Sequence, residues 1–169
     1  MGSLLLFQKY WVDKNSKNSF FLYARSLSIL WGEDKRYWQW RRIQETSDEV
    51  IEVAELLDVC WLDVTGKFET ASLSPGTLYE LAFVVKIMKD LAYGWEAPVD
   101  VELTLPNGTK QEHKENMKEK PRGNWIEIPV GEFVTSSENI GEIKFSIYRH
   151  DGLWKRGLVV KGITIRPKY

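Results

Sequence analysis

The chain has 169 residues and a mass of 19.7 kDa, which fits a single domain. Its residues are 43% apolar and 28% charged, and this balance excludes the polar, highly charged composition of disordered chains. The formal net charge of −1 gives no global attraction to nucleic acid or anionic lipid, and the one cysteine, Cys60, excludes a domain held by internal disulfides.

The N-terminal apolar cluster at residues 4–7 is shorter than the apolar region of a signal peptide. No later stretch approaches the roughly 20 apolar residues that a membrane-spanning helix needs. We therefore expect a cytoplasmic protein that no signal peptide exports, with no membrane partner.

Short β-strands dominate the predicted elements in chain order. Period-two alternation of apolar and polar residues is clearest at 101–105 and 143–148. Turn sequences such as Asn107-Gly108 separate the apolar runs. The pattern predicts an all-β fold, an antiparallel β-sandwich with short helical segments, whose strands fall at 20–23, 27–31, 59–64, 78–88, 101–105, 125–130, 143–148 and 158–165.

One segment between these strands has helical spacing. Its apolar residues are separated by three, four and seven positions, at Val50, Val53, Ala54 and Leu57. Thr46 and Glu49 have the spacing of a capping box. The sequence favours a short helix here.

Residues 109–122 contain alternating charges and one apolar residue, Met117, so we expect a long exposed loop outside the core. Charge is also uneven along the chain. Residues 45–58 contain six acids and no base, whereas residues 152–169 contain five bases and no acid. Such segments permit self-association, although solvated faces are the commoner cause.

The usual catalytic signatures are missing from the sequence. It has no glycine-rich phosphate loop, no Gly-x-Ser-x-Gly motif and no pair of metal ligands at helical spacing. We interpret His113, in the charged loop, and His150, in a turn, as ordinary surface histidines. Cys60 lies in a strand pattern, where cysteine behaves as a small buried apolar residue. We expect no catalysis, no cofactor and no metal.

Tryptophan is unusually frequent, with eight residues in the chain. Trp61 and Trp95 fit structural positions, in the core and at a turn. The others of interest lie beside polar turn residues: Trp31, Trp38, Trp40 and Trp154. An exposed indole covers the apolar C–H face of a sugar ring, while neighbouring polar groups bind its hydroxyls. The same arrangement can stack nucleic-acid bases.

From about Ala24 to its end the sequence resembles the phloem lectins of plants, the phloem protein 2 or Nictaba-related family, and it looks most like the small cucurbit phloem-exudate lectins. Ordered motifs carry this resemblance at 24–31, 37–40, 53–56, 61–64, 77–79, 123–128, 131–133, 154–157 and 160–167.

The resemblance implies a β-sandwich of jelly-roll type that binds N-acetylglucosamine oligomers, meaning chitooligosaccharides and the chitobiose core of N-glycans. Residues 24–169 would form the carbohydrate-binding domain, and residues 1–23 an extension packed on it. It also implies synthesis in companion cells, transport in sieve-tube sap and a homodimer, in which two sites per particle raise avidity.

The resemblance also nominates site residues. The stretch 153–155 is similar to the aromatic-Trp-Lys stretch with which related F-box-associated domains hold chitobiose, with Leu153 in place of the aromatic residue. We expect Trp154 to stack on a sugar ring and Lys155 to donate a hydrogen bond to it. Trp31 and Trp38 match tryptophans implicated in sugar binding, as contacts or as supports.

Glu132 matches a glutamate proposed as a further sugar contact. Three rival functions remain open at this point. A glycosidase would need two carboxylates, from Asp63, Glu127 and Glu132. Weak RNA binding would use the acid-free segment 152–169, and a structural role in a phloem filament or plug is compatible with sugar binding.

Overall fold

The computed structural model describes residues 4–169. Their secondary structure consists of β-strands joined by turns and by four single-turn 3₁₀ helices. The strands are β1 (Leu4–Leu6), β2 (Gln8–Val12), β3 (Asn18–Tyr23), β4 (Ser28–Ile29), β5 (Trp38–Gln44), β6 (Glu49–Leu56), β7 (Val59–Glu69), β8 (Leu78–Ile87), β9 (Val99–Thr104), β10 (Lys110–Glu115), β11 (Trp125–Val134), β12 (Glu142–Lys155) and β13 (Leu158–Pro167). The 3₁₀ helices are η1 (Ala24–Ser26), η2 (Thr70–Ser72), η3 (Met117–Glu119) and η4 (Ser137–Asn139).

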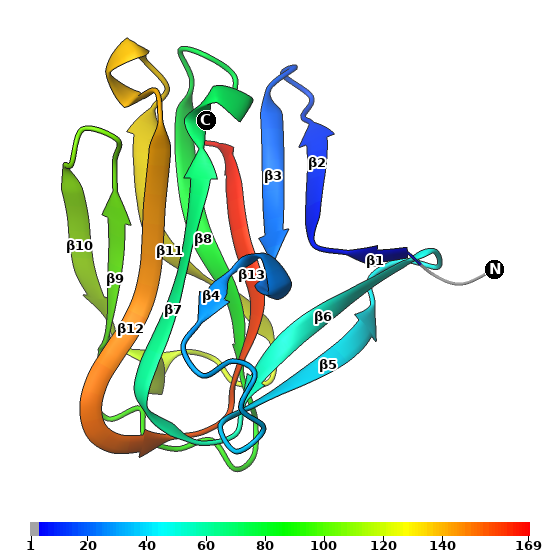
Figure 1. Ribbon diagram of the computed structural model, residues 1–169, viewed down its shortest axis with the longest axis vertical. Helices are drawn as coiled ribbons and strands as arrows, with labels where there is room; N and C mark the ends of the chain where they lie inside the picture. The colour runs from blue at the N-terminus through cyan, green and yellow to red at the C-terminus, as the bar shows by residue number, and fades with distance from the viewer. Residues whose placement is uncertain (1–3) are drawn as a thin grey trace.

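The strands form two sheets that pack face to face (Figure 1). The smaller sheet has five strands in the order β10-β9-β12-β7-β4. The larger sheet contains eight strands, and its long strand β13 pairs with β3, β6 and β8. All pairings are antiparallel except that of β1 with β6. The predicted all-β antiparallel sandwich with short helical segments is confirmed.

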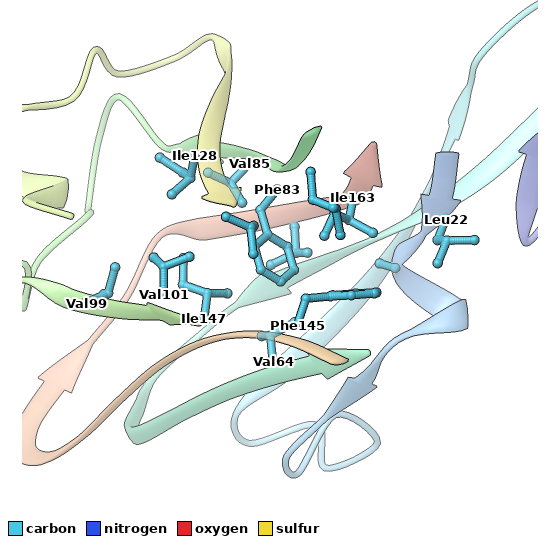
Figure 2. Close-up of a cluster of buried hydrophobic side chains, with 14 of the residues drawn as sticks. Leu22, Val64, Phe83, Val85, Val99, Val101, Ile128, Phe145, Ile147 and Ile163 are labelled. Carbon is cyan, nitrogen blue, oxygen red and sulfur yellow. The ribbon is translucent and has the colours of Figure 1, made fainter. Parts of the chain in front are cut away.

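The core lies between the two sheets because alternate residues of their strands point inward (Figure 2). Phe145 of β12 meets Phe83 of β8 edge to face, with ring centroids 6.0 Å apart. Both rings are almost fully buried, and each such side chain contributes about 1.5–3 kcal/mol through burial. The same alternation points the even-numbered residues of β12, up to His150, away from the core, where they form part of the outer face of the smaller sheet.

The helix predicted at 46–57 is wrong, because the segment forms β6. β6 pairs with β5 on one side and with β1 and β13 on the other. Val53 and Ala54, which point to opposite faces of the strand, are both buried. Burial on both faces removes the period of two, so apolar residues fall by chance at helical spacing. Thr46 and Glu49 do contact each other, but in the turn between β5 and β6.

The exposed loop predicted at 109–122 is also wrong in part. Residues 110–115 form β10, an edge strand that pairs with β9 through its backbone and leaves its charged side chains in solvent. Met117, the one apolar residue of the segment, is buried in the core. The turn expected at Asn107-Gly108 is present, with Gly108 at a φ of +88°.

The acidic and basic segments face each other within one chain. β6 and β13 are neighbours in the larger sheet, where Glu55 pairs with Val159. Lys161 contacts Glu45 of the acidic segment at 3.1 Å, whereas Arg166 contacts Glu127, outside that segment, at 2.6 Å. The charge asymmetry along the sequence is therefore largely neutralised inside the protein, and it gives no support to self-association.

The N-terminal residues contribute strands to the larger sheet. β3 pairs with β13, and Phe20 and Leu22 lie in the core. The extension assigned to residues 1–23 thus includes a core strand, while its first three residues lie outside the described part of the chain. Among residues 4–169, no helix has the length and apolar character to cross a membrane.

Candidate functional site

The most exposed tryptophan lies in a bulge of β12. β12 and β7 pair regularly up to His150 opposite Trp61, and pairing resumes only at Lys155 opposite Val59. The residues between, 151–154, are unpaired with β7 and form the bulge of β12, which we call the Trp154 loop. Trp154 is 53% exposed and Leu153 47% exposed. The loop presents an indole and an apolar neighbour to solvent. The C-terminal part of β12, which contains it, lies at one end of the sandwich (Figure 1).

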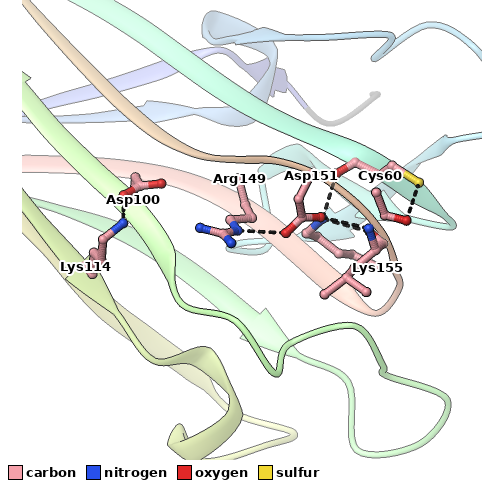
Figure 3. A network of polar contacts seen from close by, with 8 residues as sticks. Cys60, Asp100, Lys114, Arg149, Asp151 and Lys155 are labelled. Atoms are coloured by element: carbon pink, nitrogen blue, oxygen red, sulfur yellow. Dashed lines mark hydrogen bonds and ion pairs between the residues drawn. The ribbon is translucent and has the colours of Figure 1, made fainter.

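Lys155 holds this loop from inside. Its side chain is 1% exposed, and Nζ donates to the carbonyl oxygen of Cys60 at 2.6 Å, to Oδ1 of Asp151 at 2.7 Å and to the carbonyl oxygen of Leu153 at 2.8 Å (Figure 3). An ammonium group has three N–H donors, and all three have acceptors here. The expected hydrogen bond from Lys155 to a sugar does not fit this arrangement. The structure gives Lys155 a positioning role instead.

Asp151 fixes the base of the Trp154 loop together with Lys155, and we call these two residues the anchor of the loop. The sequence analysis did not identify Asp151. Its carboxylate accepts hydrogen bonds from Nε of Arg149 at 2.7 Å, from Nζ of Lys155 and from the backbone N–H of Leu153 at 2.9 Å. Desolvation by itself raises the pKa of Asp151, but the hydrogen bonds from Lys155 and Arg149 outweigh it and lower the pKa to about 2. The carboxylate therefore stays ionised and the loop stays anchored at neutral pH.

Trp31 occupies the turn that follows β4. Its backbone has a φ of +59°, a left-handed conformation that is uncommon for a bulky residue. The ring is 47% exposed and leans on Tyr37, with centroids 5.4 Å apart. A non-glycine residue held in this region costs of the order of 1 kcal/mol, and such positions cluster at functional sites. The turn thus combines an uncommon backbone conformation with an exposed indole.

A hollow of about 400 Å³ adjoins Trp31. The guanidinium of Arg25 lies 3.7 Å over the ring of Trp40 and pairs with Glu33 and Glu52. Trp40 in turn donates from Nε1 to the carbonyl oxygen of Gly32 at 2.8 Å. An exposed indole thus stands beside charged donors and acceptors, as recognition of a hydroxylated ring requires.

Trp61 was assigned to the core, and the structure corrects this. The side chain is 46% exposed on the outer face of the smaller sheet. It stacks on His150, with ring centroids 4.5 Å apart and an interplanar angle of 3°. Nε2 of His150 lies 2.9 Å from Oδ2 of Asp63. His150, predicted to lie in a turn, is therefore part of β12, and its side chain contacts both Trp61 and Asp63. Trp61 and His150 together form a second aromatic surface next to the Trp154 loop.

One short stretch of β7 connects these features. The carbonyl oxygen of Cys60 accepts from Lys155, and the carbonyl oxygen of Asp63 accepts from the backbone N–H of Leu30 at 3.0 Å. The loops that carry Trp154 and Trp31 are therefore attached to the same strand, three residues apart. Cys60 itself is partly buried, with Sγ 3.6 Å from the carbonyl oxygen of Gly152.

Two nominated residues are not part of this arrangement. Trp38 is 2% exposed and belongs to the core, so it offers no surface for a ligand to contact. Glu132 pairs with Glu80 near the start of β8, whereas the Trp154 loop leads into Leu158, opposite Ile87 at the other end of β8. Seven residues of strand separate these positions, roughly 23 Å. Glu132 contacts Lys168 at 2.7 Å instead.

Trp95 has the structural role that was expected. It is 2% exposed and donates from Nε1 to the carbonyl oxygen of Arg156 at 3.0 Å. Among residues 4–169, the structure forms no group of three or more histidine, cysteine or acidic side chains that could hold a metal ion. The chemistry that the site offers is stacking and hydrogen bonding.

The fold and the site define a β-sandwich protein that displays tryptophan side chains on loops at one end. Residues 17–167 match the family described as phloem protein 2. The chain belongs to this family.

Among curated proteins, the chain is 52% identical over 163 residues to a protein named Lectin from Luffa acutangula, covering 95% of this chain and 77% of that one. It is 50% identical over 163 residues to Protein PHLOEM PROTEIN 2-LIKE A1 of Arabidopsis thaliana, covering 95% of this chain and 66% of that one. A protein named Lectin from Coccinia grandis is 32% identical over 154 residues, with 90% and 97% covered. The chain thus spans just under two thirds of the Arabidopsis relative.

Solved structures overlap less closely. The carbohydrate-binding module TmCBM61, in complex with beta-1,4-galactotriose, has a TM-score of 0.46 and 11% identity, covering 84% of this chain and 87% of that one. The CBM22-1 xylan-binding domain of Paenibacillus barcinonensis Xyn10C has a TM-score of 0.43 and 13% identity, covering 98% and 96%.

Proposed function

We propose that this protein is a non-catalytic lectin that binds N-acetylglucosamine oligomers at the end of the sandwich carrying Trp154 and Trp31. One observation carries the proposal: Trp154 is more than half exposed on a loop whose base is fixed by the buried Lys155. Exposing an indole to water costs free energy unless a partner covers it, and a fixed loop loses little entropy when that partner binds.

The proposed contacts follow from the chemistry of the sugar. The indole of Trp154 covers the apolar face of one N-acetylglucosamine ring, and Leu153 extends the apolar surface. Trp31 offers a second indole, with the Arg25–Glu33 pair beside it for hydroxyl and acetamide groups. A neutral hydrogen bond contributes about 0.5–1.5 kcal/mol, so a monosaccharide with few contacts binds weakly and longer oligomers bind better.

The names of two relatives agree with sugar binding. The proteins from Luffa acutangula and Coccinia grandis are both named Lectin, and each covers at least nine tenths of this chain. The phloem names of other relatives support a place in the phloem. We propose further that the protein is made in the cytosol of companion cells and travels in sieve-tube sap.

The carboxylates nominated for a glycosidase are engaged elsewhere. Asp63 contacts His150, Glu127 contacts Arg166 and Glu132 contacts Lys168. The hydrogen bonds from Arg166 lower the pKa of Glu127, which suits an ion pair and opposes a general acid. Glu127 and Glu132 also lie on the larger sheet, while Asp63 lies on the smaller one. These positions favour binding without catalysis.

RNA binding is the less favoured alternative. This alternative rests on the acid-free segment 152–169. Four of the five bases there nevertheless contact acids: Lys155 with Asp151, Lys161 with Glu45, Arg166 with Glu127 and Lys168 with Glu132. Paired cations attract phosphate weakly. A structural role in filaments or plugs is compatible with the lectin and would use other surfaces.

A homodimer also belongs to this proposal, on a different basis from segment charge. Leu4, Phe7, Tyr10 and Val12, on β1, β2 and the bend between them, are each more than half exposed. Exposed apolar groups of this kind are typical of subunit contacts, and a dimer would double the sites available to one glycan. Light scattering tests this: a single species of 19.7 kDa at working concentration would contradict it.

Isothermal titration with N-acetylglucosamine, chitobiose and chitotriose tests the sugar site. We expect affinity to rise with oligomer length and to be lost in Trp154→Ala. Trp11→Ala is the matched control, because Trp11 lies on β2 of the other sheet and is also partly exposed. Full chitotriose affinity in Trp154→Ala, or equal losses in both variants, would contradict the proposed site.

A further inference from the structure

A second hollow lies on the outer face of the smaller sheet, away from the Trp154 loop. It has a volume of about 670 Å³ and extends across all five strands of the sheet, from Ser28 on β4 to Lys110 on β10. Its lining is mainly the outward-pointing side chains of β4, β7, β12 and β9. The groove meets the hollow beside Trp31 at one edge, where Leu27 and Ser28 line both, and its remaining lining residues lie outside the sugar site proposed above.

A row of small hydroxyl side chains forms the floor of this groove. Ser28 pairs with Thr65, Thr65 pairs with Ser146, and Ser146 pairs with Glu102, so the four residues lie side by side on successive strands. Within residues 4–169, none of the three hydroxyl groups has a protein hydrogen-bond partner. Small side chains leave the sheet hollow here, and their free hydroxyls can both donate and accept.

A row of lysines runs beside the hydroxyls. Lys67 pairs with Lys144 across β7 and β12, Lys144 pairs with Thr104, and Thr104 pairs with Lys110. Like charges directly opposite each other destabilise a sheet. The Lys67–Lys144 pair therefore destabilises the sheet. An anionic ligand that contacts both lysines would offset this repulsion.

Acidic side chains compensate this row only in part. Lys67 comes no closer than 3.9 Å to Glu142, and Lys110 lies 3.2 Å from Glu102. Lys144 is exposed and has no ion pair in the described part of the chain. Three lysines and one glutamate line the groove, which leaves a local positive charge on a protein of net charge −1.

We propose that this groove binds an acidic oligosaccharide, a chain of sugar rings that carries carboxylate groups. The carboxylates would lie over Lys144 and Lys67, and the ring hydroxyls over the row Ser28–Thr65–Ser146. Glu102 would accept from further hydroxyls. The lysine row spans three strand spacings, roughly 14 Å, so it suits an oligomer better than a single ring.

The lining disfavours nucleic acid. Among residues 4–169, Phe145 is the one aromatic residue that lines the groove, and it is 1% exposed, so these residues offer no ring to stack on a base. Glu102, together with Asp100 and Glu112 on neighbouring positions of the same face, repels closely spaced phosphates. An acidic saccharide places its carboxylates over the lysines and also supplies hydroxyl donors to the acids, which a phosphate group cannot do.

The test uses a pentamer of α-1,4-linked galacturonic acid, with its methyl ester as a neutral ligand of the same rings. We expect the wild-type protein to bind the acid and not the ester in isothermal titration. Lys144→Gln should weaken this binding about tenfold, the effect of one lost charge-assisted hydrogen bond. Lys14→Gln is the matched control, because Lys14 is an exposed lysine in the turn between β2 and β3.

Two further measurements show whether weakened pentamer binding in Lys144→Gln comes from the loss of a groove contact. Chitotriose affinity should be unchanged in Lys144→Gln, and chitotriose should not compete with the pentamer. The proposal for the groove can therefore fail while the proposal for the chitotriose site holds, and the reverse. The urea midpoint of Lys144→Gln should be equal to or above that of the wild type, because a repulsion is removed. A lower midpoint would mean that misfolding weakens the binding. The pentamer affinity of Lys67→Gln would then replace that of Lys144→Gln as the test of the groove.

The proposal is overturned if the pentamer does not bind, if the methyl ester binds equally well, or if Lys14→Gln loses as much affinity as Lys144→Gln. Equal binding of a single-stranded RNA at the same salt concentration, abolished by Lys144→Gln, would mean a general polyanion surface and would also overturn it.

Discussion

The indole of Trp61 and the imidazole of His150 lie parallel on neighbouring strands, with 4.5 Å between their centroids. Asp63 fixes the imidazole by a hydrogen bond, so the pair forms a flat surface of defined orientation. The Trp154 loop begins at the next residue after His150. A chain of sugar rings that leaves Trp154 along β12 would meet this surface.

Replacing Trp61 by alanine should therefore affect long ligands more than short ones. We expect Trp61→Ala to weaken chitotriose binding severalfold and to leave the affinity for N-acetylglucosamine unchanged, because only the oligomer reaches the second surface. Stability should change by less than about 1 kcal/mol, since the side chain is half exposed. Titration of both sugars checks this. An equal loss for the monosaccharide would place Trp61 in the first site.

Trp31 and Trp38 should respond in opposite ways to truncation. Trp38→Ala should lower the free energy of unfolding by about 3–5 kcal/mol, because it leaves a cavity in the core. Trp31→Ala should cost less than about 1 kcal/mol and should still reduce chitotriose affinity. Urea unfolding and calorimetry on the two variants check this. A large loss of stability in Trp31→Ala would make its role structural.

Lys155 should act on stability and on sugar binding together. Lys155→Met removes three hydrogen bonds and leaves Asp151 without its buried cation, which should cost about 3 kcal/mol. The freed loop should also lower chitotriose affinity. Lys161→Met is the control, because its pair with Glu45 is nearer the surface and should contribute under about 1 kcal/mol. Unchanged stability in Lys155→Met would contradict the anchoring role.

The anchor should also depend on pH through Asp151. Its pKa is about 2 in the folded protein against the ordinary value of 3.8, so the folded state binds its proton less tightly than the unfolded state. The stabilisation, about 1–2 kcal/mol, is present above pH 4 and is lost as the pH falls towards 2. Urea unfolding of wild type and Asp151→Asn from pH 7 to pH 2 checks this. We expect the difference between them to shrink on acidification, and a constant difference would count against the prediction.

Glu132 should be silent in sugar binding at the Trp154 loop. It lies towards the other end of the larger sheet, and its ion pair with Lys168 is half exposed. Glu132→Gln should change stability by less than about 1 kcal/mol and leave chitotriose affinity unchanged. A clear loss of affinity, measured by the same titration, would indicate a second sugar site near the C-terminus.

The strands with clear alternation could be predicted because one face of each is buried and the other is wet. β9 and most of β12 belong to this class. The same rule, applied to β7, would have placed Trp61 correctly: Leu62 and Val64 point inward, so position 61 points outward. β6 could not be predicted in this way, because burial on both faces erases the alternation.

The anchor of the site could be recognised only in three dimensions. The burial of Lys155 depends on the carbonyl oxygen of Cys60, a backbone atom 95 positions away in the sequence. Side-chain patterns contain no information about such a contact. The exposed Trp154 and Trp31 could be nominated, because polar turn residues surround both.

The attachment of both loops to β7 has a consequence for redesign. The two anchoring acceptors are main-chain oxygens, so they persist when the side chain at position 60 is exchanged. Residues at the tips of the loops, such as Leu153, can then be randomised to select new sugar specificities while β7, Asp151 and Lys155 are kept as a constant framework.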